Sequence, residues 1–161
     1  MRFKCALVDV GFAESAPITI KVEQALGASA DKVFAILADT AQWPLWFPNM
    51  EEATYTSSSP YGAGSTRMVK VGLMGIDERI VAWEEGRRYS FRFEAVSLPI
   101  FRAFCEDYQL ELIDEQRCRL QIQAGYEVNG LLKTAGFTMR PRFQRVFQEA
   151  ALALAKYVED S

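Results

Sequence analysis

Hydrophobic and polar residues alternate along several short stretches of the chain. In residues 18–24, isoleucine and valine positions alternate with Thr19, Lys21 and Glu23. A period of two residues is typical of a strand with one buried face. Further stretches of this kind are separated by glycine, proline or acidic turn residues and cover residues 52–56, 66–71, 76–83, 89–95, 103–112 and 119–128. Short strands with close turns predict an antiparallel sheet.

The stretch between the first and second predicted strands has helical periodicity instead. Ser29 is a suitable N-cap for residues 30–39, where Val33, Phe34 and Leu37 form one apolar face. Residues 40–48 are rich in aromatic side chains and contain two prolines, so they allow only one short helical turn. We therefore expect two short helices between the first two strands.

The C-terminal part of the chain predicts a long helix. Pro141 suits the first position of a helix. After it, apolar residues recur at intervals of three and four, at Phe143, Val146, Phe147, Ala150, Leu154 and Val158. A helix over residues 141–159 would be about 28 Å long. Residues 131–139 predict a separate helical segment before it, interrupted at Gly136.

These elements predict an α+β fold, in which a curved seven-stranded antiparallel sheet wraps around the long C-terminal helix. The sheet must bury its apolar face, and the terminal helix is its only large apolar partner. A strongly twisted sheet cannot touch one helix everywhere, so a cavity is expected between them. Residues 18–161 are predicted to form a single ligand-binding domain, and residues 1–17 an N-terminal arm or an edge strand.

Composition narrows the classes of function. The 161 residues carry a net charge of −3, and the basic residues are scattered, which argues against a nucleic-acid partner. The chain contains no histidine, which excludes histidine-dependent catalysis and histidine-ligated metal sites. Neither a membrane span nor a signal peptide is evident. We expect a cytoplasmic protein, monomeric or homodimeric, with no cofactor and no metal.

The three cysteines, Cys5, Cys105 and Cys118, are expected to be free thiols. Cys105 and Cys118 fall on the two arms of one predicted hairpin, but pairing about its turn places Cys105 opposite a residue near Tyr126. Their Cα atoms would then be too far apart for a disulfide.

Several segments, taken in order, resemble the START-related polyketide cyclase/dehydrase superfamily, which has the helix-grip fold. The resemblance covers residues 18–159 and rests on ADKVFAILAD (30–39), WPLWFP (43–48), GSTR (64–67), DERIVAWE (77–84) and RRYSF (87–91). It implies the helix-grip fold and a hydrophobic ligand, such as a lipid, sterol, polyketide, plant hormone or quinone-like molecule. A minority of members catalyse cyclisation or dehydration.

The strand pattern predicts which side chains face the cavity. In a hairpin that turns at residues 114–116, directly opposed residues share one face, and the mainly apolar face is the concave one. The expected ligand-binding aromatic and aliphatic residues are Trp46 and Phe47 at the mouth, Phe91, Phe93, Phe104, Tyr108, Ile122 and Tyr126 on the sheet, and Phe143 and Phe147 on the helix. The alternative is that these side chains fill a solid core.

Three charged residues, Arg67, Glu78 and Glu106, are candidate ligand-binding and catalytic residues. Glu106 is predicted to face inward, where an unpaired carboxylate is costly, and Arg67 is its candidate partner. Glu78 and Arg79 compete for the inward face of their strand, and the family resemblance favours Glu78. Desolvation would raise the pKa of a buried carboxyl toward a value useful in general acid catalysis. The alternative is a structural ion pair.

A basic cluster lies near the start of the predicted terminal helix, at Arg140, Arg142 and Arg145. These arginines are candidates for contact with an anionic head group or with a partner. The alternative is a solvated helix face.

Three functions remain open from the sequence. The first is binding of a hydrophobic small molecule, such as a lipid, a polyketide or an aromatic compound. The second is a cyclase or dehydratase without metal or histidine, with Glu106 or Glu78 as acid or base and Arg67 or Tyr108 polarising a carbonyl. The third is an interaction module with a quinone-chaperone or ribosome-associated role.

Overall fold

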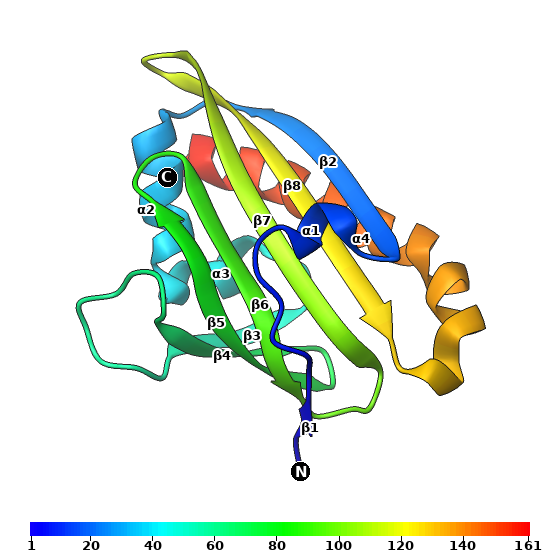
Figure 1. The fold of residues 1–161 in the computed structure, drawn as a ribbon. Coiled ribbons are helices and arrows are strands. Elements are labelled where there is room, and N and C mark those ends of the chain that lie inside the picture. Colours follow the sequence, from blue (N-terminus) through cyan, green and yellow to red (C-terminus); the bar gives the residue numbers. More distant parts are fainter.

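The computed structural model describes residues 1–161 and is built around a curved antiparallel sheet (Figure 1). Its strands are β1 (Phe3–Lys4), β2 (Ile18–Leu26), β3 (Met50–Tyr55), β4 (Thr66–Val71), β5 (Met74–Glu84), β6 (Arg88–Val96), β7 (Phe101–Asp114) and β8 (Arg117–Val128). Its helices are α1 (Phe12–Ser15), α2 (Ala30–Ala38), α3 (Trp43–Trp46) and α4 (Lys133–Asp160), with 3₁₀ turns at Thr40–Gln42 and Gly130–Leu132.

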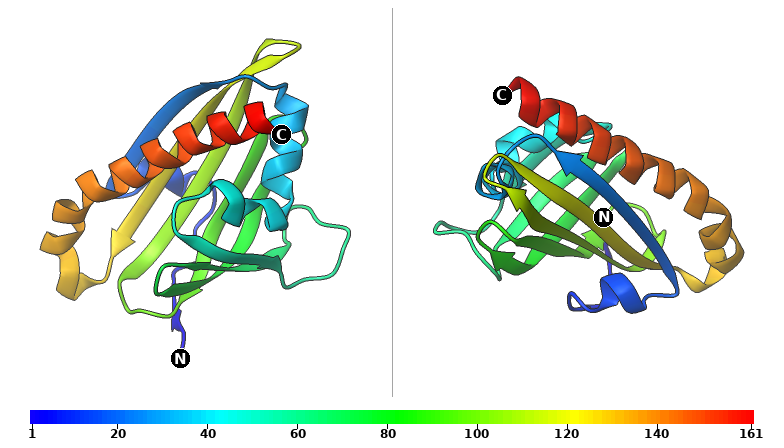
Figure 2. Two further views of the ribbon diagram at one scale, coloured as in Figure 1. Left: turned by 180° about the vertical axis from the view of Figure 1, so that it is seen from behind. Right: turned by 90° about the horizontal axis from the view of Figure 1, so that it is seen from above.

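The strand order confirms the predicted fold class. Seven strands follow one another across the sheet in the order β2-β8-β7-β6-β5-β4-β3, and all neighbours are antiparallel. The short helices α2 and α3 connect β2 to β3, which lie at opposite ends of this path. Helix α4 lies across the concave side of the sheet (Figure 2).

The register of the last hairpin is also as predicted. Glu106 pairs with Ala124, and Tyr108 pairs with Ile122. Cys105 pairs with Gly125, far from Cys118, and all three cysteines are free and buried. Alternation of side-chain direction along each strand is a local property, so the sequence pattern was sufficient to assign these faces.

The terminal helix differs from the prediction. Helix α4 begins at Lys133, so Pro141 lies inside it rather than at its first position. Because proline has no N–H to donate to the preceding turn, the helix bends near its start (Figure 2). Gly136 does not interrupt the helix. It is buried where a Cβ would meet Val128 Cγ2 at 2.6 Å, and its carbonyl accepts a hydrogen bond from Tyr126 at 3.1 Å.

The N-terminal arm is held inside the sheet, so the alternative of an edge strand is wrong. Strand β1 pairs with β6, where β6 and β7 diverge. Just after it, the Cys5 amide donates to the Glu94 carbonyl of β6 at 2.9 Å, and the Ala6 amide donates to the Arg102 carbonyl of β7 at 2.7 Å. The arm thus satisfies backbone groups that the diverging strands leave unpaired.

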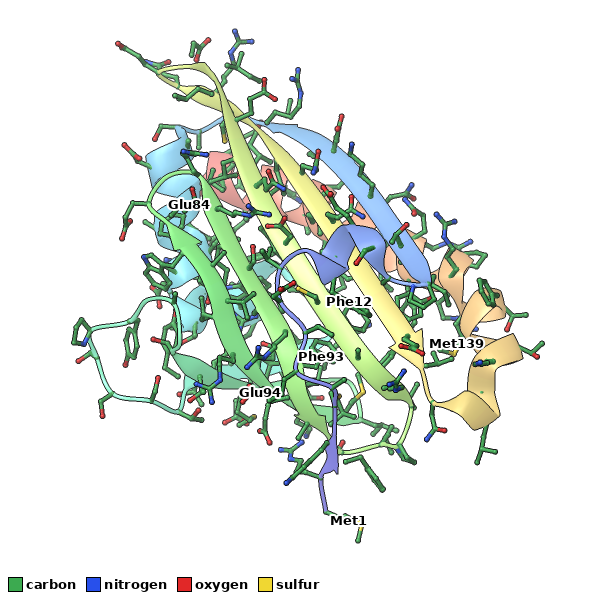
Figure 3. All side chains as sticks on the ribbon, viewed as in Figure 1. Met1, Phe12, Glu84, Phe93, Glu94 and Met139 are labelled. Carbon is green, nitrogen blue, oxygen red and sulfur yellow. The ribbon has the colours of Figure 1, made fainter.

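Residues 6–16, here called the strap, then cross the convex face of the sheet. Figure 3 shows Phe12, on α1, in front of β7 and β8. Ala13 is fully buried, and its carbonyl accepts a hydrogen bond from Gln123 Nε2 at 3.0 Å. A Cβ on Gly125 would lie 2.9 Å from Ala13 Cα and would collide with the Phe12 carbonyl oxygen. A glycine at this position therefore allows the strap to lie flat on β8.

The apolar core lies on the concave side, between the sheet and the helices. Along α4 it contains Phe147, Ala150, Leu154 and Val158, all buried. Apolar burial on this scale is the main favourable contribution to folding. No helix of the structure has the length and hydropathy needed to cross a membrane.

Candidate functional site

A cavity lies between α4 and one half of the concave face. Its volume is about 90 Å³, and 14 of its 17 lining residues are hydrophobic. The sheet contributes residues from β3, β4, β5, β6 and β7, whereas β2 and β8 contribute none. This asymmetry arises because α4 packs directly against β2 and β8 and stands away from the remaining strands.

Nine of the thirteen residues expected to bind a ligand line this cavity. They are Phe47, Arg67, Glu78, Phe91, Phe93, Phe104, Glu106, Phe143 and Phe147. The other four, Trp46, Tyr108, Ile122 and Tyr126, do not line it. For these four residues, the alternative of a filled core describes the structure better.

The excluded residues are covered by helices at either end of the cavity. Tyr126 packs against Phe143 with ring centroids 5.3 Å apart, under the first turns of α4. The Tyr108 and Trp43 ring centroids are 5.4 Å apart. Trp46 packs against the same Trp43, with centroids 4.7 Å apart and the rings tilted by 42°, rather than closing the mouth. Ile122 is fully buried on β8. Strand alternation identifies a shared face, but the covering elements decide which part of that face stays open.

Eight further residues line the cavity that were not among the expected ligand-binding residues: Trp43, Met50, Val69, Val71, Met74, Ile76, Phe101 and Val146. For some of them, strand alternation in the sequence indicated an inward side chain. Val69 and Val71 alternate with Arg67 on β4, and Ile76 alternates with Glu78 on β5. Their contribution to the cavity could not be assigned, because the sequence does not show which half of the sheet the terminal helix leaves uncovered.

Arg67 and Glu78 form a buried ion pair at one wall of the cavity. Arg67 Nε donates to Glu78 Oε1 at 2.6 Å, and both side chains are almost completely buried. Glu78 faces inward with Ile76 and Ile80 by regular alternation along β5, and the register shift at this point adds a residue on β6 instead. Arg79, the alternative for this face, instead pairs with Glu94 at 2.9 Å at a partly exposed position.

The Arg67 guanidinium packs against two aromatic rings. Its Cζ atom lies 4.4 Å from the Trp43 ring centroid and 4.2 Å from the Phe91 centroid. Burial lowers the pKa of Arg67, but the Glu78 carboxylate more than reverses this, so the guanidinium stays charged. Its Nη1 donates weakly to the Tyr89 hydroxyl at 3.4 Å, and its Nη2 is buried without any hydrogen-bond partner.

Glu106 faces the same cavity but is not paired with Arg67. Its Oε1 accepts a hydrogen bond from the Tyr108 hydroxyl at 2.9 Å. Burial, together with the nearby Glu78 carboxylate, raises the pKa of Glu106 to about 8. Burial also raises the pKa of Glu78, against the opposing effect of Arg67. At neutral pH Glu106 is therefore mainly protonated, and the ion pair beside it leaves the cavity close to neutral.

This arrangement offers hydrogen-bond donors to an otherwise apolar space. Arg67 Nη2 has a free N–H, and a protonated Glu106 carboxyl can also donate. An unpartnered buried donor is costly, because the group has lost its hydration without gaining a partner. The cavity is therefore chemically suited to an apolar molecule that carries an oxygen acceptor, such as a carbonyl or a hydroxyl.

Comparison with known proteins identifies the family. The family of polyketide cyclase / dehydrase and lipid transport proteins matches residues 17–159. This chain belongs to that family. Its curated relatives include Rv2574 of Mycobacterium tuberculosis strain H37Rv and Mb2604 of Mycobacterium bovis, both described as uncharacterized. Each is 32% identical over 159 residues, which are 98% of this chain and 94% of the relative. The resemblance found in the sequence is thus confirmed.

Solved structures of the same superfamily share the fold of this family member. A START superfamily protein from Mycobacterium smegmatis superposes with a TM-score of 0.77 at 16% identity, covering 88% of this chain and 97% of the other. The Zhui aromatase/cyclase from a Streptomyces species superposes with a TM-score of 0.66 at 15% identity, covering 86% and 93%. The family and these neighbours share a fold associated with hydrophobic ligands.

Proposed function

We propose that this protein binds an apolar, aromatic small molecule through one oxygen atom that accepts a hydrogen bond from Arg67. The observation that carries the proposal is the buried Nη2 of Arg67, which has no partner and belongs to a cavity wall. Aromatic side chains such as Phe91, Phe93 and Phe104 supply the apolar contacts. A hydrogen bond from a charged donor contributes roughly 1.5–3 kcal/mol when it replaces an unsatisfied group.

Ligand entry requires the cavity to widen. A volume of about 90 Å³ corresponds to roughly three water molecules at their liquid density. Pockets that hold drug-sized ligands measure about 300–1,000 Å³. The lining side chains that are only partly buried are Val71, Met74, Phe143 and Val146, at the ends of β4 and β5 and on α4. Movement of these side chains would enlarge the cavity at its mouth.

A matched pair of ligands tests the proposal. Acetophenone and ethylbenzene have similar shapes, but only acetophenone carries an oxygen acceptor. Both should raise the thermal unfolding temperature, and acetophenone should bind roughly tenfold more tightly, in line with one charge-assisted hydrogen bond. The naphthalene analogues, 2-acetylnaphthalene and 2-ethylnaphthalene, extend the comparison to a larger ring system.

The variant that isolates the anchor is Arg67→Met combined with Glu78→Gln. Arg67→Met alone would leave the Glu78 carboxylate buried and uncompensated, at a cost of about 3–5 kcal/mol. In the double variant the preference for acetophenone should disappear while binding of ethylbenzene remains. Unchanged melting with all four ligands would reject cavity binding, and an equal response to ketone and hydrocarbon would reject the role of Arg67.

Glu106 supports a second candidate function, a cyclisation or dehydration reaction that needs a general acid. A carboxyl with a pKa of about 8 is protonated at neutral pH and can give its proton to a leaving hydroxyl or a carbonyl oxygen. Glu106→Gln should then abolish turnover of a poly-β-ketone substrate while leaving its binding within about twofold. Full turnover in Glu106→Gln would exclude this residue as the acid.

A further inference from the structure

Exposed apolar side chains gather at one rim of the molecule, around the cavity mouth. We name this set the mouth patch, and it consists of Leu73, Leu98, Leu131, Leu132 and Phe137. Leu73 is 94% exposed in the β4–β5 turn, Leu131 is 95% exposed before α4, and Phe137 is 62% exposed on its first turns. Large apolar side chains exposed in one region indicate an interaction surface.

Hydrogen bonds join the loops of the mouth patch into one rim. The Ser97 amide, in the β6–β7 loop, donates to the Gly75 carbonyl next to the β4–β5 turn at 2.9 Å. The Asn129 amide, which precedes α4, donates to the Ile100 carbonyl of the β6–β7 loop at 2.8 Å. The ends of these loops reach the lower right of Figure 1 together with the start of α4. The partly buried lining residues of the cavity lie at the β4–β5 turn, at Val71 and Met74, and on α4, at Phe143 and Val146.

The charge around the rim is distributed unevenly. Residues 128–148 contain four basic side chains, Lys133, Arg140, Arg142 and Arg145, and no acidic one, although the whole chain has a net charge of −3. None of the four forms an ion pair, whereas Arg140 donates to the Thr19 carbonyl of β2. Arg142 is exposed and lies one turn before Val146, so both are on the helix face beside the mouth.

The acidic residues near this rim are mostly neutralised. Three of them are ion-paired, in the pairs Arg2–Asp77 at 3.7 Å, Lys70–Glu51 at 2.9 Å and Arg102–Glu127 at 3.0 Å. Glu52 is exposed and lacks such a partner. The surface around the rim is therefore basic. It flanks the apolar side chains of the mouth patch, which lie on separate loops.

We propose that the mouth patch docks this protein onto an anionic lipid surface, with the cavity mouth facing the bilayer. Leu73, Leu131 and Phe137 would enter the region between head groups and acyl chains, and Lys133 and Arg142 would contact anionic head groups. Basic residues near an anionic leaflet and apolar side chains at its interface stabilise binding together. A second protein chain would need a continuous complementary face, whereas a fluid interface accommodates separate protruding side chains. The proposal does not depend on which ligand the cavity holds.

Vesicle co-sedimentation tests the docking. The purified protein is mixed with vesicles of phosphatidylcholine alone, or of phosphatidylcholine with phosphatidylglycerol, at low and high ionic strength. We expect binding to the vesicles that contain phosphatidylglycerol, and a marked loss of that binding at high salt. Equal binding to both kinds of vesicle, or binding to neither, would overturn the proposal.

Variants separate the apolar contribution from the basic one. The triple variant Leu73→Ser/Leu131→Ser/Phe137→Ser should bind at least tenfold more weakly, because three apolar side chains no longer enter the interface. Lys133→Gln/Arg142→Gln should lose about 30-fold for anionic vesicles. Leu152→Ser is the matched control, since Leu152 is 59% exposed on α4 but distant in sequence from the rim. It should bind as the unaltered protein does.

Two further outcomes would overturn the proposal. If Leu152→Ser weakens vesicle binding as much as the triple variant, the effect does not belong to the mouth patch. If the unaltered protein is a dimer by light scattering and the triple variant is a monomer, a second copy of the chain covers this surface. These outcomes are independent of the acetophenone test, so failure of docking and failure of cavity binding can be distinguished.

Discussion

Glu106 is a carboxyl group whose protonation is determined by its position rather than by its own chemistry. Its neighbours on the same face of β7, Phe104 and Tyr108, are aromatic, and its one hydrogen bond comes from Tyr108. Arg67, the only cation in the cavity lining, is already paired with Glu78. Since no cation remains to compensate a second carboxylate, the neutral form of Glu106 is favoured.

This raised pKa makes a prediction about stability. Between about pH 5 and pH 8 the folded protein keeps a proton on Glu106 that the unfolded chain has released, because the folded pKa lies above the ordinary value. Rising pH should therefore lower the free energy of unfolding by about 1.4 kcal/mol per pH unit through this group. Glu106→Gln has no such titration, and its stability should fall less steeply.

Urea unfolding of both proteins across this pH range measures the effect. The difference between the two curves of stability against pH isolates the contribution of Glu106 from that of the other titrating groups. Glu78 is one of these groups, because burial raises its pKa as well. Parallel curves would mean that Glu106 is ionised in the folded protein at neutral pH. The Glu106 carboxyl could then not act as a hydrogen-bond donor at the cavity wall.

At the scale of elements, the strap on the convex face is the least expected part of the fold. It depends on close approach to β8 at Gly125, where a Cβ would meet Phe12 and Ala13 backbone atoms. Cys5, directly before the strap, is buried, and burial raises the pKa of its thiol to about 11. A thiol of this kind reacts slowly while the strap stays in place.

Replacing Gly125 with alanine should therefore loosen the strap. Overpacking of this kind costs about 1–3 kcal/mol, so modification of Cys5 by a thiol reagent should become at least about fivefold faster. Mass spectrometry of the modified peptides measures the rate separately for Cys5 and for Cys118, which is buried on β8 and serves as an internal reference.

Gly130→Ala provides the matched control, since a Cβ at that glycine meets no atom within 4 Å. Its Cys5 should react at the rate of the unaltered protein. If Gly125→Ala leaves the Cys5 rate unchanged, or accelerates Cys118 equally, the strap is not held by its contact with β8.

At the scale of the whole molecule, α4 determines where the cavity lies. It packs on β2 and β8, and Arg140 and Gln144 donate to the Thr19 and Lys21 carbonyls of β2. These bonds cover the outer edge of the sheet at β2, whereas the cavity is lined by residues of β3 to β7. Figure 2 shows α4 crossing the sheet on its concave side. Since an edge strand with free carbonyls invites pairing with other chains, this contact also protects the sheet.

The sequence by itself determined the strands, their faces and the last hairpin's register, because side-chain direction alternates along a strand whatever surrounds it. It also identified Arg67 and Glu106 as inward charges, since a charged residue within an apolar alternation is visible locally. For β5 it left Glu78 and Arg79 as alternatives, and the family resemblance favoured Glu78. The family resemblance, and with it the helix-grip fold, came from the order of such local patterns.

Only the tertiary structure decided which inward side chains meet empty space. Tyr108 and Glu106 share a strand face, yet α3 covers the tyrosine ring and leaves the carboxyl at the cavity. The insertion of the arm between β6 and β7, and the continuation of α4 through Pro141, were likewise decided by contacts between distant segments. Packing of a helix against a sheet depends on the shapes of both surfaces at once, and no local pattern in the chain encodes that fit.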